Sequence, residues 1–89
     1  MYNLTKTKEK TMNELIQNIE KLHTTPMGVE RIRRNLSLGD ADAVEFCREQ
    51  ILSENAEIER RGKNWYVRVN GSEITVNAYS FTIITAHKV

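Results

Sequence analysis

Apolar and polar residues alternate along the C-terminal third of the chain. Apolar side chains occupy every second position over residues 65–69 and again over residues 74–78. Alternation with a period of two is typical of strands that bury one face. Asn70-Gly71, between the two runs, is the strongest short-range signal for a hairpin turn. The pattern therefore predicts an antiparallel hairpin with Trp65 on its apolar face.

Two further strands complete the predicted sheet. Residues 57–60 are short and charged, which is typical of an edge strand that is protected from mispairing. We expect Gly62 to turn this strand back into the hairpin, and residues 81–87, FTIITAH, to form the last strand. The four strands together predict an antiparallel meander.

The register of the last strand stays open, because both of its faces hold apolar residues. Either Phe81 and Ile83 face the core, or Ile84 does. In the second case Thr85 and His87 join the open face of the sheet.

The N-terminal half has helical periodicity instead. Apolar residues recur at intervals of three and four over residues 12–22 and predict the first helix. Pro26 suits the first position of a second helix, with Thr25 as its N-cap. A third helix is expected to begin at Asp40, as N-cap, and to end at residues 53–55. The sequence thus predicts an α+β fold in which three N-terminal helices cover one face of a four-stranded antiparallel sheet.

Composition limits what this fold can do. The chain has 89 residues, which is enough for one domain. We expect a polar lead-in over residues 1–11 and a single domain over residues 12–89. Its net charge of +1, from 13 basic and 12 acidic residues, gives no global attraction to nucleic acid or membrane. Without an apolar span or signal sequence, and with only Cys47 as a thiol, a cytoplasmic protein is expected. A homodimer would add burial, although the sequence does not require one.

No metal site or cofactor is predicted. His23 and His87 lie far apart in the sequence, and no spacing resembles a zinc motif. Cys47 lies on an apolar helical stripe and is interpreted as a small buried hydrophobe.

Side chains suited to RNA cluster around the first hairpin strand. Residues 60–68 contain no acid. Basic groups bind phosphates, and aromatic rings stack on unpaired bases. Trp65 belongs to the core in one interpretation and to the RNA surface in the other. The candidate binding residues of this region are Arg60, Arg61, Lys63, Arg68 and Asn77.

His87 is the candidate proton-transfer group, because histidine exchanges protons near neutral pH. Lys88 would stabilise charge on a phosphorane, and Thr85 and Tyr66 would orient the substrate. His23 either caps the first helix or reaches the same site.

Three arginines crowd the exposed side of the second helix: Arg31, Arg33 and Arg34. They would suit an acidic protein partner.

Three segments carry a family resemblance: LHTTPMGVERIRRNL, GKNWYV and ITVNAYSFTIITAHK. They resemble a small bacterial family of unknown function, which implies no activity. The order of elements, helices and then a meander over residues 56–88, is also similar to the barnase–EndoU–colicin–RelE group of metal-independent RNases. That second resemblance implies a catalytic set drawn from His, Lys, Arg, Tyr, Thr and Ser on the sheet.

Two classes of function remain. The first is a small metal-independent RNase, toxin-like and paired with an antitoxin. The second is a binding module without catalysis, such as a phage or mobile-element inhibitor or accessory factor that binds protein or nucleic acid.

Overall fold

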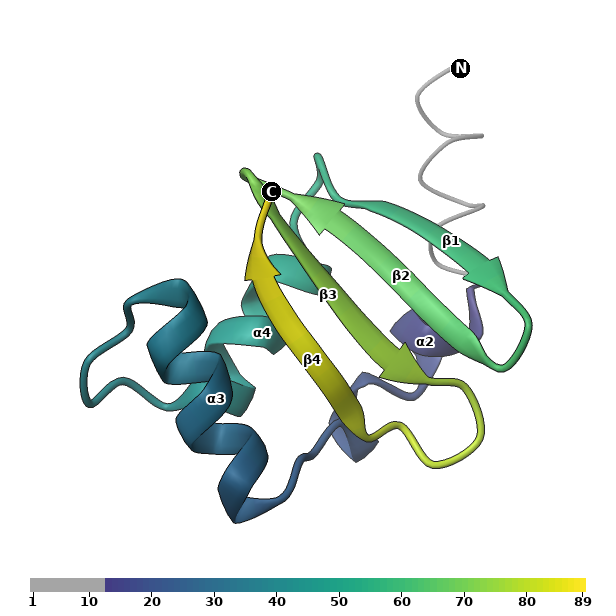
Figure 1. The fold of residues 1–89 in the computed structure, drawn as a ribbon. Helices are drawn as coiled ribbons and strands as arrows, with labels where there is room; N and C mark the ends of the chain where they lie inside the picture. The colour runs from purple at the N-terminus through teal and green to yellow at the C-terminus, as the bar shows by residue number, and fades with distance from the viewer. Residues whose placement is uncertain (1–12) are drawn as a thin grey trace.

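The computed structural model describes residues 13–89, in which helices precede a four-stranded antiparallel sheet (Figure 1). The α+β architecture predicted from the sequence is confirmed. The elements are α2 (Glu14–Gln17), the 3₁₀ helix η1 (Ile19–Lys21), α3 (Pro26–Leu36), α4 (Ala43–Ile51), β1 (Glu57–Arg61), β2 (Asn64–Val69), β3 (Ser72–Asn77) and β4 (Ile83–Lys88). The lead-in predicted for residues 1–11 lies outside the described residues.

The sheet is a meander in the order β1-β2-β3-β4. Val69 pairs with Ser72 across the predicted turn. Asn70 and Gly71 both have positive φ, 50° and 78°, as a two-residue hairpin with matching twist requires. The predicted Asn-Gly hairpin is therefore confirmed.

A β-bulge settles the open register of β4. Thr75 pairs with Thr85, but Val76 pairs with Ile83, so Ile84 is the extra residue. Ile83 is 2% exposed and Ile84 is 45% exposed. A bulge reverses the alternation of faces beyond it. As a result Ile83 lies in the core while Thr85 and His87 lie on the open face, a combination that neither predicted register contained.

The single first helix predicted over residues 12–22 is wrong in its described part. The chain forms α2, breaks at Asn18 and continues as η1. Asn13 caps α2 by accepting hydrogen bonds from the backbone N–H groups of Leu15 and Ile16. Asn18 donates both its backbone N–H and its side-chain amide to Glu14 O, which ends the α-helix after one turn. Asparagine competes with regular helical bonding in this way, and apolar spacing does not register it.

The caps of the two longer helices explain their bounds. Thr25 Oγ1 accepts from Gly28 N at 3.0 Å, and Pro26 occupies the first turn, as predicted. The predicted N-cap of the third helix is wrong: Asp42, and not Asp40, accepts from Glu45 N at 3.0 Å. Helix α4 therefore begins later than its sequence suggested.

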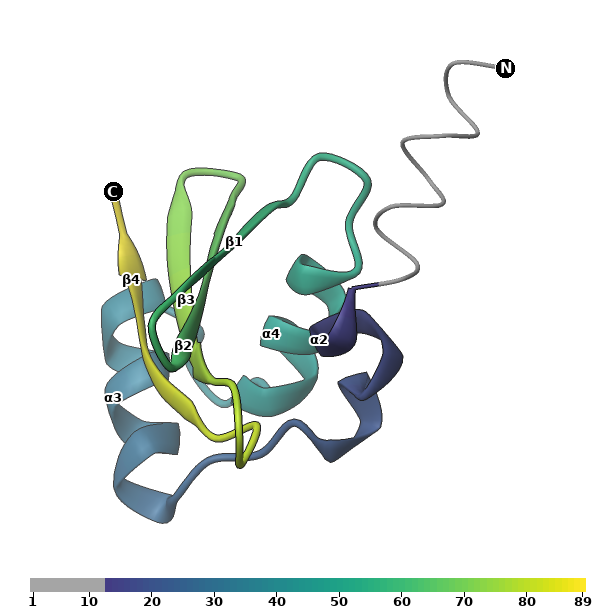
Figure 2. The same ribbon diagram turned by 90° about the vertical axis from the view of Figure 1, so that its right-hand side faces the viewer.

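The core lies between the sheet and the helices. Helix α3 packs along β4, while α4 packs on β2, and the open face of the sheet points away from α2 and α4 (Figure 2). Leu15 and Leu22 add the apolar side chains of the first segment. Trp65 is 8% exposed and belongs to this core. No helix of the described residues is long and apolar enough to cross a membrane.

Candidate functional site on the open face of the sheet

Antiparallel pairing arranges the open face in rows across the strands. One row, called here the His87 row, consists of Arg68 on β2, Glu73 on β3 and His87 on β4. The adjacent Tyr66 row consists of Tyr66, Thr75 and Thr85. Residues opposite each other in a sheet lie close enough for direct contact. The meander therefore brings together groups that are up to nineteen positions apart in the sequence.

Glu73 lies at the centre of the His87 row. Its Oε2 accepts from Arg68 Nε at 3.1 Å, and its Oε1 is 3.9 Å from His87 Nε2. The Glu73 side chain is 15% exposed, whereas that of His87 is 45% exposed. The carboxylate is thus held between a cation and an imidazole that solvent can reach.

The Tyr66 row is closely packed beside the His87 row. Thr75 is 6% exposed although it lies on the open face. Tyr66 accepts a long hydrogen bond from Asn64 Nδ2 at its hydroxyl oxygen, 3.5 Å away. Neighbouring side chains cover Thr75, so the surface here is packed rather than loosely solvated.

A hollow of about 460 Å³ adjoins the two rows over β1, β2 and β3. Arg61 lies over the Tyr66 ring, 4.1 Å from its centroid, and its Nε is 3.6 Å from Glu59 Oε2. The residues lining this hollow are Glu57, Ile58, Glu59, Arg61, Tyr66, Arg68 and Glu73. It combines an aromatic surface with both signs of charge.

The charge of the open face differs from the basic surface that the sequence suggested. Arg61 and Arg68 each face a glutamate, Glu59 and Glu73 respectively. Residues 60–68 contain no acid, but Glu59 lies two positions before Arg61 on β1, and strand pairing places Glu73 of β3 opposite Arg68. Two of the candidate binding residues, Arg61 and Arg68, are therefore paired with glutamates in the folded protein.

Several candidate residues lie away from the His87 row. Lys88 follows His87 and pairs with Ser72, so the strand pleat directs it to the opposite face. Arg60 pairs with Trp65 on the core side of β1, and Lys63 lies in the β1–β2 turn. Lys88, Arg60 and Lys63 therefore do not share a site with His87.

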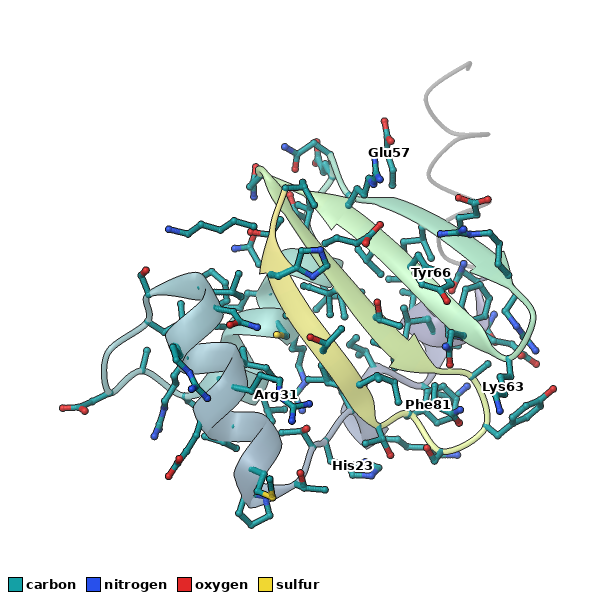
Figure 3. The ribbon with its side chains drawn as sticks, viewed as in Figure 1. His23, Arg31, Glu57, Lys63, Tyr66 and Phe81 are labelled. Atoms are coloured by element: carbon teal, nitrogen blue, oxygen red, sulfur yellow. The ribbon has the colours of Figure 1, made fainter. Side chains whose placement is uncertain are left out.

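Asn77 and His23 have structural partners instead. Asn77 Oδ1 accepts from the N–H groups of Tyr79 and Ser80, which shapes the β3–β4 turn. His23 Nδ1 donates to Lys21 O at 2.8 Å, and Nε2 is 3.1 Å from Thr82 Oγ1. Figure 3 shows His23 at the end of the sheet opposite Glu57. The hypothesis that His23 reaches the same site as His87 is wrong.

The three arginines of α3 differ in role. Arg33 donates from Nε to Ala41 O at 2.9 Å and from Nη2 to Asp40 O at 3.3 Å, so it holds the α3–α4 loop. Arg31 and Arg34 are exposed. Arg31 also lines a second hollow of about 270 Å³ between α3 and the start of β4. The interpretation of all three as solvent-exposed binding groups therefore fails for Arg33.

Glu73 is the residue that the sequence reasoning missed. It stands two positions after the Asn70-Gly71 turn and two before Thr75, so strand alternation already assigned it to the open face. Its partner Arg68 follows from the hairpin register, since a two-residue turn places these positions opposite each other. His87 could not be added in the same way, because its face depends on the bulge at Ile84.

The described residues contain no group of three or more His, Cys, Asp or Glu side chains arranged to hold a metal ion. Cys47 is fully buried, as predicted, and burial raises the pKa of its thiol to about 12. It is therefore a packed core group and not a nucleophile at neutral pH.

Fold and site together define a small α+β domain with a polar sheet face that the described helices leave open (Figure 2). Residues 16–87 match the model of a family described as protein of unknown function, DUF3781, and the chain belongs to this family. The family resemblance drawn from three sequence segments is thus confirmed. No curated protein and no solved structure matches the chain, and the topological likeness to RNases stays a prediction.

Proposed function

We propose that this protein is a metal-independent endoribonuclease that cuts single-stranded RNA on the open face of its sheet. The observation that carries the proposal is the His87 row, in which Arg68, Glu73 and His87 meet across three neighbouring strands. Transesterification of RNA needs a base, an acid and a cation near one phosphate. The row supplies one group of each kind.

The chemistry assigns a role to each group. Glu73 takes the proton of the 2′-hydroxyl, whose oxygen attacks the adjacent phosphorus. The bond from phosphorus to the 5′-oxygen breaks, and His87 protonates the departing oxygen. Arg68 stabilises the charge that develops on the phosphorane oxygens. The products are a 2′,3′-cyclic phosphate and a free 5′-hydroxyl.

Substrate binding would free the base. Glu73 accepts a hydrogen bond from Arg68 at 3.1 Å in the structure without RNA. A phosphate competes for the same guanidinium, which leaves the carboxylate free to accept a proton. The hollow beside Tyr66 has room for the neighbouring nucleotide, whose base would lie near the Tyr66 ring.

The test compares variants of the row with a neighbour on the other face. His87→Ala and Glu73→Gln should each lower the cleavage rate of a fluorescent single-stranded RNA by roughly 10²–10⁴. Lys88→Gln should cleave at the parental rate, because the Lys88 side chain extends from the opposite face of the sheet. Circular dichroism would verify that all three variants fold. Equal rates for His87→Ala and the parent would refute the proposal.

A second candidate is a protein-binding module, favoured by a different observation. Met27 is 73% exposed and Ile84 45% exposed, and both line the second hollow together with Arg31. Exposed apolar groups beside a cation suit a partner that presents an apolar side chain next to an acid. A photo-crosslinking residue placed at Met27 should capture a discrete protein in cells, while one at the exposed Leu52 should not. Equal capture at both positions would count against this candidate.

A further inference from the structure

Cations and aromatic rings gather at one end of the sheet, away from the His87 row. Two turns meet there, because Ala78 N in the β3–β4 turn donates to Lys63 O in the β1–β2 turn at 2.8 Å. Figure 3 shows Lys63, Phe81 and His23 along this end, opposite Glu57. This surface, called here the turn end, consists of Lys21, Arg60, Lys63, Tyr79 and Phe81.

Tyr79 is the exposed ring of the turn end. It is 73% exposed, and Arg60 Cζ lies 5.6 Å from its centroid. The same guanidinium lies 5.3 Å from the Trp65 ring, and its Nε donates to Gly62 O at 2.8 Å. Arg60 is thereby fixed between a buried ring and an exposed one. The outer ring is held beside a cation and remains open to a ligand.

The Tyr79 position is also fixed by its own turn. Asn77 Oδ1 accepts from the N–H groups of Tyr79 and Ser80 at 3.0 and 2.9 Å. Asparagine stabilises turns through such side-chain to backbone bonds. An exposed ring on an ordered turn loses little conformational freedom when a flat ligand stacks on it.

The cations of the turn end have no acidic partners in the part of the chain that the structure describes. Lys21 Nζ lies 5.8 Å from the Phe81 ring, and Lys63 is exposed. Among the described salt bridges, none includes Lys21, Arg60 or Lys63, whereas Arg61 and Arg68 on the open face are both paired. Glu20, also on η1, is the acidic residue directly before Lys21 in the sequence. Phosphate groups would therefore find unpaired cations at the turn end and paired ones on the open face.

We propose that the turn end binds single-stranded nucleic acid, with one base stacked on Tyr79 and neighbouring phosphates on Lys63 and Lys21. Exposed rings next to unpaired cations form the usual platform for unpaired strands. A protein partner fits less well, because interface anchors fill packed pockets, and neither hollow described above is lined by these residues. The proposal shares its RNA ligand with the proposed function but does not need cleavage to occur.

The turn end is connected to the proposed cleavage site. Asn64 and Asn77 pair at the start of β2, and the Tyr66 row and then the His87 row follow along the same strands. Two residues of a strand span about 7 Å. A strand of RNA that is anchored on Tyr79 could therefore continue over Tyr66 to the His87 row, with the turn end holding its flank.

The test is fluorescence anisotropy with labelled RNA and DNA of about 12 nucleotides and mixed sequence, a length within the usual site size. It uses the His87→Ala protein, which keeps the turn end intact and protects the RNA from cutting. Tyr79→Leu should weaken the Kd about 5-fold or more, while Tyr79→Phe should leave it within about 2-fold, because stacking needs the ring and not the hydroxyl. Binding that tolerates Tyr79→Leu would overturn the proposal.

Salt dependence tests the cations with a matched control. Lys63→Gln should reduce the slope of log Kd against log salt by about 0.7, as expected for one lost phosphate contact on a single strand. Arg34→Gln, which removes an exposed cation from α3, should leave the slope unchanged. An equal effect of Arg34→Gln would mean diffuse attraction and would contradict a defined site.

The outcomes separate the two proposals. Binding of RNA and DNA that depends on Tyr79, without any cutting by the parent protein, would support the turn end and refute the endoribonuclease. RNA cleavage with a KM that Tyr79→Leu leaves unchanged would support the endoribonuclease and refute nucleic-acid binding at the turn end. Equal Tyr79-dependent binding of an acidic peptide such as poly-glutamate would replace nucleic acid with a protein ligand and overturn the proposal as stated.

Discussion

Cys47 is the residue whose chemistry the fold alters most. Burial among apolar side chains raises the pKa of its thiol from 9.0 to about 12, since the thiolate loses its hydration. The folded state therefore holds this proton more tightly than the unfolded chain. This contribution to stability is fully present below about pH 9 and is lost as the pH rises from 9 toward 12.

The same burial makes the thiol inert. We expect Ellman's reagent to react with Cys47 in the folded protein at pH 8 at least about 100-fold more slowly than in urea, because reaction requires opening of the core. The urea sample serves as the control for reagent and thiol. Rapid modification without denaturant would show that Cys47 is accessible and that α4 does not pack as described.

Gly28 is a second residue whose surroundings decide its role. Replacing glycine inside a helix with alanine usually stabilises it by about 1 kcal/mol. Here an added Cβ would lie 2.1 Å from Thr24 Oγ1, which donates to Ile83 O at 3.0 Å. The substitution must displace Thr24 and break its hydrogen bond to Ile83 O, which links the segment before α3 to β4.

We therefore predict that Gly28→Ala destabilises the protein by about 1–3 kcal/mol in denaturant unfolding. Thr24→Ala removes the obstructing oxygen. The double variant should therefore lose less stability than the sum of the losses in the two single variants. Strict additivity of the two changes, or a stabilising Gly28→Ala, would contradict the close contact at this position.

Adjacent isoleucines in β4 show what the bulge does to this strand. Ile83 is 2% exposed and Ile84 is 45% exposed, although either could have faced the core from the sequence. Ile83→Ala should lower the free energy of unfolding by about 2–5 kcal/mol, and Ile84→Ala by less than about 1 kcal/mol. Denaturant unfolding of the pair would reveal the register, and the reverse order would place His87 toward the helices.

The α3–α4 connection depends on one arginine of three. Arg33→Gln should lower stability by about 1 kcal/mol, because two backbone carbonyl groups of the loop lose a charged donor. Arg34→Gln is the matched control, one position along the helix and exposed, and should leave the melting temperature unchanged. Equal melting temperatures for the two variants would show that the loop does not need the Arg33 bonds.

The elements that could be predicted from the sequence are those with strong local signals. The Asn70-Gly71 hairpin and the Thr25-Pro26 helix start depend on neighbouring residues, and both are confirmed. The break at Asn18 and the cap at Asp42 depend on which of several polar side chains bonds to the backbone. Periodicity does not distinguish between such side chains, so these bounds were missed.

The candidate site was predictable in part for the same reason. His87, Arg68 and Tyr66 were named from the sequence, and strand pairing places them in adjacent rows. Lys88 was included wrongly, although alternation alone separates consecutive residues onto opposite faces. Glu73 reaches Arg68 through pairing between strands, and Glu59 lies just outside residues 60–68, so a count of charge along that stretch could show neither partner.

At the scale of the whole molecule, the net charge of +1 conceals an uneven distribution. Paired charges occupy the open face, while unpaired cations occupy the turn end in the described part of the chain. A substrate drawn to the turn end and cut at the His87 row would use both regions. The arrangement also predicts that activity falls with added salt, since phosphate contacts are screened.

The decisive measurement for the His87 row is the product of RNA cleavage in the presence of EDTA. We expect a single-stranded RNA to yield fragments that end in a 2′,3′-cyclic phosphate by mass spectrometry, and the same sequence with 2′-O-methyl groups to remain intact. Both results are expected if the 2′-oxygen attacks the phosphorus. RNA that remains whole, or a methylated strand that is cut equally well, would contradict the assignment of Arg68, Glu73 and His87 as an endoribonuclease site.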